Sequence, residues 1–231
     1  MPFIYGFDYT YIIYVLPALI FAMWAQYNVQ STFKKYSKVE SERGMTGYDA
    51  ARRILDANGL HHVRIEQVAG DLTDHYDPKA NVIRLSDTVH SVSSVAAVGV
   101  AAHEAGHAVQ YAEGSSPIKI RTAIIPITRI GSNLAFPLVL LGLLFSAPFL
   151  AGIGVILFGA AVLFQLVTLP VEFNASSRAI AALSSSGMSD EAVGDAKKVL
   201  RAAAMTYVAA LATAIGNFLR LLTIANRSRR N

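Results

Sequence analysis

The sequence contains no cysteine, which excludes disulfide bonds and leaves histidine, aspartate and glutamate as the side chains able to bind a metal ion. It is also poor in charge: 16% of its 231 residues are Asp, Glu, Lys or Arg, whereas 53% are hydrophobic. So much apolar surface exceeds what one soluble core needs. We therefore expect part of the chain to face lipid.

A basic patch with interleaved aromatic residues is also lacking, although the net charge is +4. The Lys and Arg residues lie beside apolar segments instead, which is where residues that flank membrane spans are found. The expected environment is therefore a lipid bilayer, and nucleic acid is not an expected partner.

The first apolar run covers residues 11–25 and has the position of a signal peptide. A signal peptide begins with a basic region, but the residues before this run include Asp8 and no Lys or Arg. We therefore expect residues 1–26 to form a retained transmembrane anchor.

Two further apolar stretches predict more spans. Residues 131–170 are long enough, at about 1.5 Å per residue, to cross a bilayer core of roughly 30 Å twice. Pro148 and Gly152 near the middle predict the turn of a transmembrane hairpin. Residues 202–231 are expected to form a fourth transmembrane helix with a basic tail, and their small residues favour close helix packing in lipid.

The more polar residues 27–130 predict a small α+β domain. Thr46 is a plausible N-cap of a helix that Gly59 would end. Three strands are expected, over residues 63–68, 72–76 and 81–85, the last two as a hairpin. A helix rich in small residues should follow over residues 91–111. The predicted fold class is thus an α-helical membrane protein of about four transmembrane helices with a small α+β domain.

The run His103-Glu104-Ala105-Gly106-His107 lies in this last helix. Residues four apart on a helix differ by about 40° of rotation and about 6 Å of rise, so both imidazoles can bind one metal ion. Glu104, about 100° further round, can take a proton from a water that the metal activates. The alternative is that both histidines are ordinary core or surface residues without a metal. The small flanking residues argue against it, because they leave room for a metal and a substrate.

A catalytic zinc site needs a third protein ligand. Our choice is Glu172, which follows Pro170 at the start of a polar helical segment expected over residues 171–201. A lone carboxylate beside the membrane calls for a partner. The alternative is an acidic residue in the first turn of a helix, where the helix dipole favours it.

Three segments carry a resemblance to a known family: residues 72–78 (LTDHYDP), 102–108 (AHEAGHA) and 169–175 (LPVEFNA). On these the chain resembles the YugP-type neutral zinc metallopeptidases of bacteria, which are membrane gluzincins, nearly end to end, and more distantly the HtpX proteases and the CAAX prenyl endopeptidases. The resemblance implies one zinc ion per chain held by His103, His107 and Glu172, with Glu104 as the general base. Related gluzincins often have Asp four residues after the ligand Glu, where this chain has Ser176, so the acceptor that orients a histidine ligand is in doubt.

Four other polar residues are weaker candidates for binding the substrate or the developing oxyanion: His75, Tyr76, Asn174 and Arg178. Tyr76 and His75 could instead pack the hairpin, and Arg178 could pair with an acid. The strand over residues 81–85, if it is a sheet edge, could align an extended peptide, or it could be an ordinary edge strand. The other histidines, His61, His62 and His90, are expected on the surface or in turns.

The expected function is hydrolysis of peptide bonds in membrane-proximal or unfolded proteins. Basic residues after the first span and before the second place the zinc domain on the cytoplasmic side of the cell membrane by the positive-inside rule, although the arginines of the tail argue the other way. The alternative is a membrane scaffold or assembly factor with a weak, inactive or structural metal site, and a fourth protein ligand such as His75 would favour it. A transporter is less expected, and a membrane protein partner or a homo-oligomer remains open.

Overall fold

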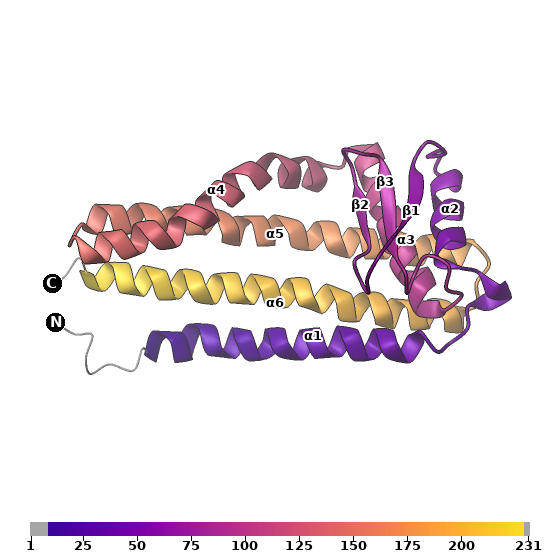
Figure 1. The fold of residues 1–231 in the computed structure, drawn as a ribbon, viewed down its shortest axis with the longest axis horizontal. Coiled ribbons are helices and arrows are strands. Elements are labelled where there is room, and N and C mark those ends of the chain that lie inside the picture. The colour runs from indigo at the N-terminus through magenta and orange to yellow at the C-terminus, as the bar shows by residue number, and fades with distance from the viewer. Residues whose placement is uncertain (1–8, 229–231) are drawn as a thin grey trace. The chain divides into compact units, whose positions relative to one another are not determined.

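The computed structural model describes residues 9–228, which are mostly helical (Figure 1). These residues group into two compact units. The first unit comprises the chain up to Ala25, Lys119–Leu169 and the chain from Thr206. The second unit comprises Gln26–Ile118 and Pro170–Met205.

Four helices are long and apolar enough to cross a membrane. They are the N-terminal helix (Tyr11–Val15 as a π-helix, continued by α1, Leu16–Tyr36), α4 (Ser116–Leu144), α5 (Pro148–Ser185) and α6 (Asp190–Ser228). Large apolar side chains such as Ile20, Phe149 and Ile156 are exposed on them, which is the side-chain pattern of a lipid-facing surface. The prediction of about four transmembrane helices agrees with this count of candidate spans.

These helices extend beyond the apolar runs that predicted them. The N-terminal helix continues to Tyr36, α4 begins at Ser116, and α5 continues through Pro170 without interruption. Pro148 begins α5 and does not lie inside the turn, in keeping with the preference of proline for a first helical position. Apolar composition marks the lipid-facing part of a helix, whereas its end depends on local hydrogen bonding, so the two boundaries differ.

Glycines allow close helix packing within the first unit. A Cβ atom at Gly154 of α5 would lie 2.6 Å from the backbone oxygen of Ala135 in α4, and one at Gly131 would lie 2.9 Å from the backbone oxygen of Leu157. Both positions therefore need glycine to keep the α4–α5 contact, as small residues do in membrane helix pairs.

The second unit contains the two shorter helices, each with a defined start. In α2 (Gly47–Ala57) the hydroxyl of Thr46 accepts a hydrogen bond from the Asp49 amide, and the Asp49 carboxylate accepts one from the Thr46 amide, which is a capping box. In α3 (Val95–Glu113) Ser94 caps the first turn and Gly114, in the left-handed conformation, ends the helix. A short 3₁₀ turn, Glu42–Gly44, precedes α2.

The sheet of this unit has the strand order β1-β3-β2, with β1 (Arg64–Val68) parallel and β2 (His75–Asp77) antiparallel to β3 (Val82–Ser86). The predicted hairpin of the last two strands is confirmed. The condition that the strand over residues 81–85 be a sheet edge is not met, because β1 pairs with the side of β3 that the hairpin leaves unpaired. The edge strand that contacts α3 is β2.

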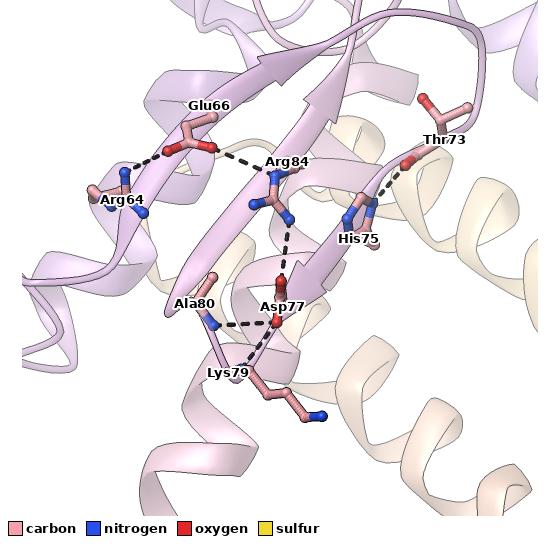
Figure 2. A network of polar contacts seen from close by, with 8 residues as sticks. All are labelled: Arg64, Glu66, Thr73, His75, Asp77, Lys79, Ala80 and Arg84. Carbon is pink, nitrogen blue, oxygen red and sulfur yellow. Dashed lines mark hydrogen bonds and ion pairs between the residues drawn. The ribbon is translucent and has the colours of Figure 1, made fainter. Parts of the chain in front are cut away.

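The two faces of the sheet differ in polarity. Ile83 and Leu85 of β3 are fully buried in the core that also contains α2 and α3 residues, and Ile65 and Tyr76 pack against it. The opposite face carries charged side chains joined by ion pairs, which Figure 2 shows: Arg64 to Glu66, Glu66 to Arg84, and Arg84 to Asp77. This alternation fixes which strand residues point toward α3.

Candidate metal centre

Helices α3 and α5 approach each other closely within the second unit, and Gly106 lies at the contact. A Cβ atom at Gly106 would be 2.7 Å from the backbone oxygen of Ala175. Because Gly106 lacks that atom, the helix face that carries His103 and His107 lies directly against α5. The flanking residues Ala101, Ala102, Ala105 and Ala108 are also buried.

This contact brings His103, His107 and Glu172 together. Their nitrogen and oxygen atoms all lie within 4.8 Å of one another, and within residues 9–228 these three form the one such group of potential metal ligands. The Oε2 atom of Glu172 lies 3.4 Å from Nε2 of His103 and 3.3 Å from Nε2 of His107. With zinc bonds of about 2.0–2.1 Å, tetrahedral ligand atoms are about 3.4 Å apart, so these separations and the donor set fit a zinc ion.

The cluster and the neighbouring Glu104 are mostly buried, and His103, with 14% of its side chain exposed, is the most accessible member of the cluster. Glu172 is 2% exposed, and Glu104 and His107 are each 8% exposed. A buried carboxylate is costly unless a positive charge or a metal ion compensates it. Glu172 lies in the interior of α5 rather than in its first turn, so the helix-dipole explanation for this residue does not apply.

Each histidine of the cluster has a polar partner at its other ring nitrogen. Nδ1 of His107 lies 3.0 Å from Oε1 of Gln110, and Nδ1 of His103 lies 3.1 Å from the hydroxyl of Ser176. Such contacts hold the ring and leave Nε2 directed at the metal position. Ser176, four residues after Glu172 on α5, therefore contacts one of the two histidines that Glu172 approaches.

Sequence reasoning did not select Gln110. It lies three residues after His107, which places both on one face of α3, but a glutamine near a histidine is common on helices. What distinguishes Gln110 is its complete burial and its contact with α5, and neither can be read from the spacing.

Asn174 and Arg178, predicted as weak candidates for substrate binding, are engaged with other side chains. Oδ1 of Asn174 accepts hydrogen bonds from Nε2 of Gln110 and Nε of Arg178, both at 2.8 Å. Arg178 also donates two hydrogen bonds to the carboxylate of Glu113, at 2.7 and 2.6 Å. The expected pairing of Arg178 with an acid is therefore present.

His75 and Tyr76 lie next to each other on β2 but point in opposite directions. His75 is on the charged face of the sheet, with Nδ1 2.8 Å from the backbone oxygen of Thr73 (Figure 2), and it is not part of the three-residue cluster. Tyr76 points toward α3, where its ring lies 5.6 Å from that of Tyr111.

The remaining histidines agree with their prediction as surface or turn residues. His61 and His62 are exposed in the turn before β1, and His90 is partly buried in the turn after β3.

Asp74 is a further carboxylate near Glu104. Burial raises the pKa of Asp74, hydrogen bonds from the Ser86 amide and hydroxyl oppose this, and the charge of Glu104 raises it further, so that the net pKa is above its usual value. The Asp74 carboxylate also fixes the loop before β2, because it accepts a 2.7 Å hydrogen bond from the Ser86 amide. This contact extends the β2–β3 hairpin, in which His75 pairs with Arg84, and the residue pattern alone does not indicate it.

These features define the class of the protein: a mostly helical chain with four candidate membrane spans and a buried cluster of two histidines and a glutamate that can hold a divalent metal ion. Residues 11–226 match the family model described as "Putative neutral zinc metallopeptidase". The chain is also 48% identical, over 215 residues, to a Bacillus subtilis (strain 168) protein described as "Putative membrane protease YugP", a match that covers 93% of this chain and 96% of the relative. This chain therefore belongs to that family of neutral zinc metallopeptidases, as its resemblance predicted. No solved structure matches it.

Proposed function

We propose that this protein is a membrane-embedded zinc metalloendopeptidase that hydrolyses peptide bonds of membrane-proximal or unfolded proteins. The observation that carries the proposal is the position of Glu172, whose Oε2 lies 3.3–3.4 Å from Nε2 of both His103 and His107. Membership of a zinc metallopeptidase family supports the choice of metal.

In this proposal His103, His107 and Glu172 would hold one zinc ion, and three is the number of protein ligands that catalytic zinc sites have. A zinc ion held by these three ligands would act as a Lewis acid toward the scissile carbonyl and would lower the pKa of a water molecule bound to it. All three ligands come from the second unit, so that site can form within one compact part of the chain.

Glu104 is the proposed general base. It follows His103 on α3 and is turned about 100° from it, beside the ligands without being one of them. As the oxygen of water attacks the carbonyl carbon, Glu104 accepts a proton from that water. It then delivers the proton to the amide nitrogen as the C–N bond breaks, which yields a carboxyl group and an amine and leaves Glu104 ionised again.

A cavity of about 380 Å³ lies beside α3, where Ala108, Tyr111 and Ala112 line it. Tyr111 lies one helical turn beyond His107, on the same face, and lines the cavity together with Tyr76, Leu60 and Val63. Its lining is mixed, because the polar residues His62 and Asn81 also line it, and its volume suits one side chain of a peptide substrate. The outer edge of β2 is the proposed place where the substrate backbone aligns, in place of the strand over residues 81–85.

The proposed division of the chain follows its composition. Residues 1–26 anchor the protein, residues 27–130 carry the peptidase helix, residues 131–170 form a membrane hairpin, residues 171–201 supply the third ligand, and residues 202–231 form the last span. Lys34, Lys35 and Lys38 follow the first span, and such residues favour the cytoplasmic side. The active site is therefore proposed to face the cytoplasm.

A fourth protein ligand that closed the site would have favoured the scaffold alternative. His75, the candidate for that role, lies on the charged face of the sheet. Its position supports an open, catalytic site over a closed, structural one.

The test is proteolysis of a denatured model protein by the purified, zinc-loaded enzyme in detergent, before and after chelation. Cleavage that chelation abolishes and zinc restores supports the proposal. Glu104→Gln should keep its zinc and lose activity by about 10²–10⁴-fold. Cleavage by this variant at the native rate would exclude Glu104 as the base, and zinc-loaded wild type without any cleavage would favour the scaffold function.

A further inference from the structure

The side chain of Gln110 is 1% exposed between α3 and α5 and makes three polar contacts. Its Nε2 atom lies 2.9 Å from the backbone oxygen of Val171 and 2.8 Å from Oδ1 of Asn174, and its Oε1 atom lies 3.0 Å from Nδ1 of His107. A buried amide with partners on both ends has a defined orientation, and here the partners determine that orientation step by step.

Arg178 determines the orientation of the Asn174 amide. A guanidinium can only donate hydrogen bonds, so the Asn174 atom 2.8 Å from Nε of Arg178 must be the amide oxygen. The bidentate pair with Glu113 holds the guanidinium in place. The orientation of the Asn174 amide is therefore determined by a guanidinium that can only donate and that is itself held by Glu113.

Asn174 and Val171 in turn determine the orientation of the Gln110 amide. Oδ1 of Asn174 and the backbone oxygen of Val171 are both acceptors, so the group that contacts them must be the NH₂ group of Gln110. The amide oxygen of Gln110 is then the atom that faces His107. An oxygen acceptor at this place requires that Nδ1 of His107 carry the hydrogen atom.

The orientation of the Gln110 amide determines the tautomer of His107. A neutral imidazole with hydrogen on Nδ1 has its lone pair on Nε2, which is the atom 3.3 Å from Glu172. We propose that Gln110 is a positioning residue, which locks His107 in the tautomer that can bind zinc through Nε2. This inference rests on the proposed function, since it takes His107 as a zinc ligand.

The partner of His103 does not determine its tautomer in the same way. Its Nδ1 atom faces the hydroxyl of Ser176, and a hydroxyl can donate or accept. The two histidines should therefore differ: the tautomer of His107 is set before zinc binds, whereas that of His103 can be selected by zinc.

The experiment compares zinc affinity, measured by competition with a chelator, with the melting temperature of the metal-free protein in detergent. Gln110→Met fills the same space without an acceptor, and Gln110→Glu keeps an acceptor oxygen beside Nδ1. Gln110→Met should lower zinc affinity by about 10–100-fold. Gln110→Glu keeps the acceptor for Nδ1 but loses the donor to Val171 and Asn174, so it should restore only part of that affinity. Gln67→Met is the matched control, because Gln67 is exposed on β1 and pairs with Asp87, and it should leave zinc affinity unchanged.

Arg178→Met provides a second variant at a less buried position and should lower zinc affinity several-fold by freeing the Asn174 and Gln110 amides. In metal-free protein, ¹⁵N spectra of the histidine rings should show hydrogen on Nδ1 of His107, and a mixture of tautomers in Gln110→Met. Wild-type affinity in both methionine variants, with only the melting temperature reduced, would overturn the proposal and leave Gln110 as a structural tie. Failure of the proposed function is distinct, because then wild type itself would bind no zinc or cleave no peptide bond.

Discussion

The hydroxyl of Ser176 lies 3.1 Å from Nδ1 of His103, one helical turn along α5 from Glu172. This contact gives His103 a polar partner at the ring nitrogen that faces away from Glu172. A hydroxyl can accept the Nδ1 hydrogen of a metal-binding imidazole, but it carries no charge to strengthen that hydrogen bond.

Replacing Ser176 should therefore change zinc affinity in a graded way. Ser176→Ala removes the acceptor and should weaken zinc binding several-fold, whereas Ser176→Asp supplies a charged acceptor and should bind zinc at least as tightly as wild type. Chelator competition measures both. Ser185→Ala is the control, since Ser185 is exposed near the end of α5 and contacts only the backbone of its own helix. Equal affinity in all four proteins would show that Ser176 does not support the site.

Gly106 should be essential for the approach of α3 to α5. Gly106→Ala places a Cβ 2.7 Å from the backbone oxygen of Ala175, so the helices must separate, at a cost of about 1–3 kcal/mol. Both the melting temperature and the zinc affinity should fall. Gly194→Ala in α6 is the matched control, because nothing lies within 4 Å of the added atom, and a helical alanine should stabilise by about 0.5–1 kcal/mol. A stable, zinc-binding Gly106→Ala protein would contradict the packing argument.

The raised pKa of Asp74 makes a prediction about stability and pH. Burial is the largest cause of the shift, so the folded protein holds the Asp74 proton more tightly than the unfolded chain does. As pH rises above the usual Asp value of about 3.9, the unfolded chain loses this proton first, and the stability that Asp74 contributes declines. The melting temperature of wild type relative to Asp74→Asn should therefore fall as the pH rises above about 4. A difference that stays constant, or rises with pH, would contradict the burial of this carboxyl group.

Sidedness can be measured directly because the native chain has no cysteine. With the proposed orientation, Lys38→Cys should resist an impermeant thiol reagent in intact cells and react after permeabilisation. If all four candidate spans cross the membrane, Ser228→Cys should show the opposite pattern. Labelling of Lys38→Cys from outside would place the zinc site on the outer side.

The sequence predicted most of the fold because its elements have strong local signals. The capping box of Thr46 and Asp49, the helix with His103 and the β2–β3 hairpin all depend on residues close together in the chain. The central position of β3 was not predicted, because strand order depends on the β1–β3 pairing, which joins residues further apart in the sequence than the hairpin does. The ends of the long helices were missed because apolar composition does not mark them.

The proposed metal ligands were predictable from spacing and resemblance, but the residues that hydrogen-bond to the two histidines were not. Gln110 and Ser176 were not identified as partners of the histidines, because those contacts exist only where α3 packs on α5. Asn174 and Arg178 were considered for substrate binding because isolated polar residues near a site suggest that role. Their contacts with Gln110 and Glu113 connect them to the support of His107.

The zinc content of purified wild type and of Glu172→Gln tests the central claim most directly. Glutamine has nearly the same size as glutamate but lacks the charge that a divalent ligand site needs. We expect about one zinc per chain in wild type, as for a single three-ligand site, and loss of most of that zinc in Glu172→Gln at the same chelator concentration. Equal zinc content in the two proteins would contradict the joint binding of one ion by Glu172, His103 and His107.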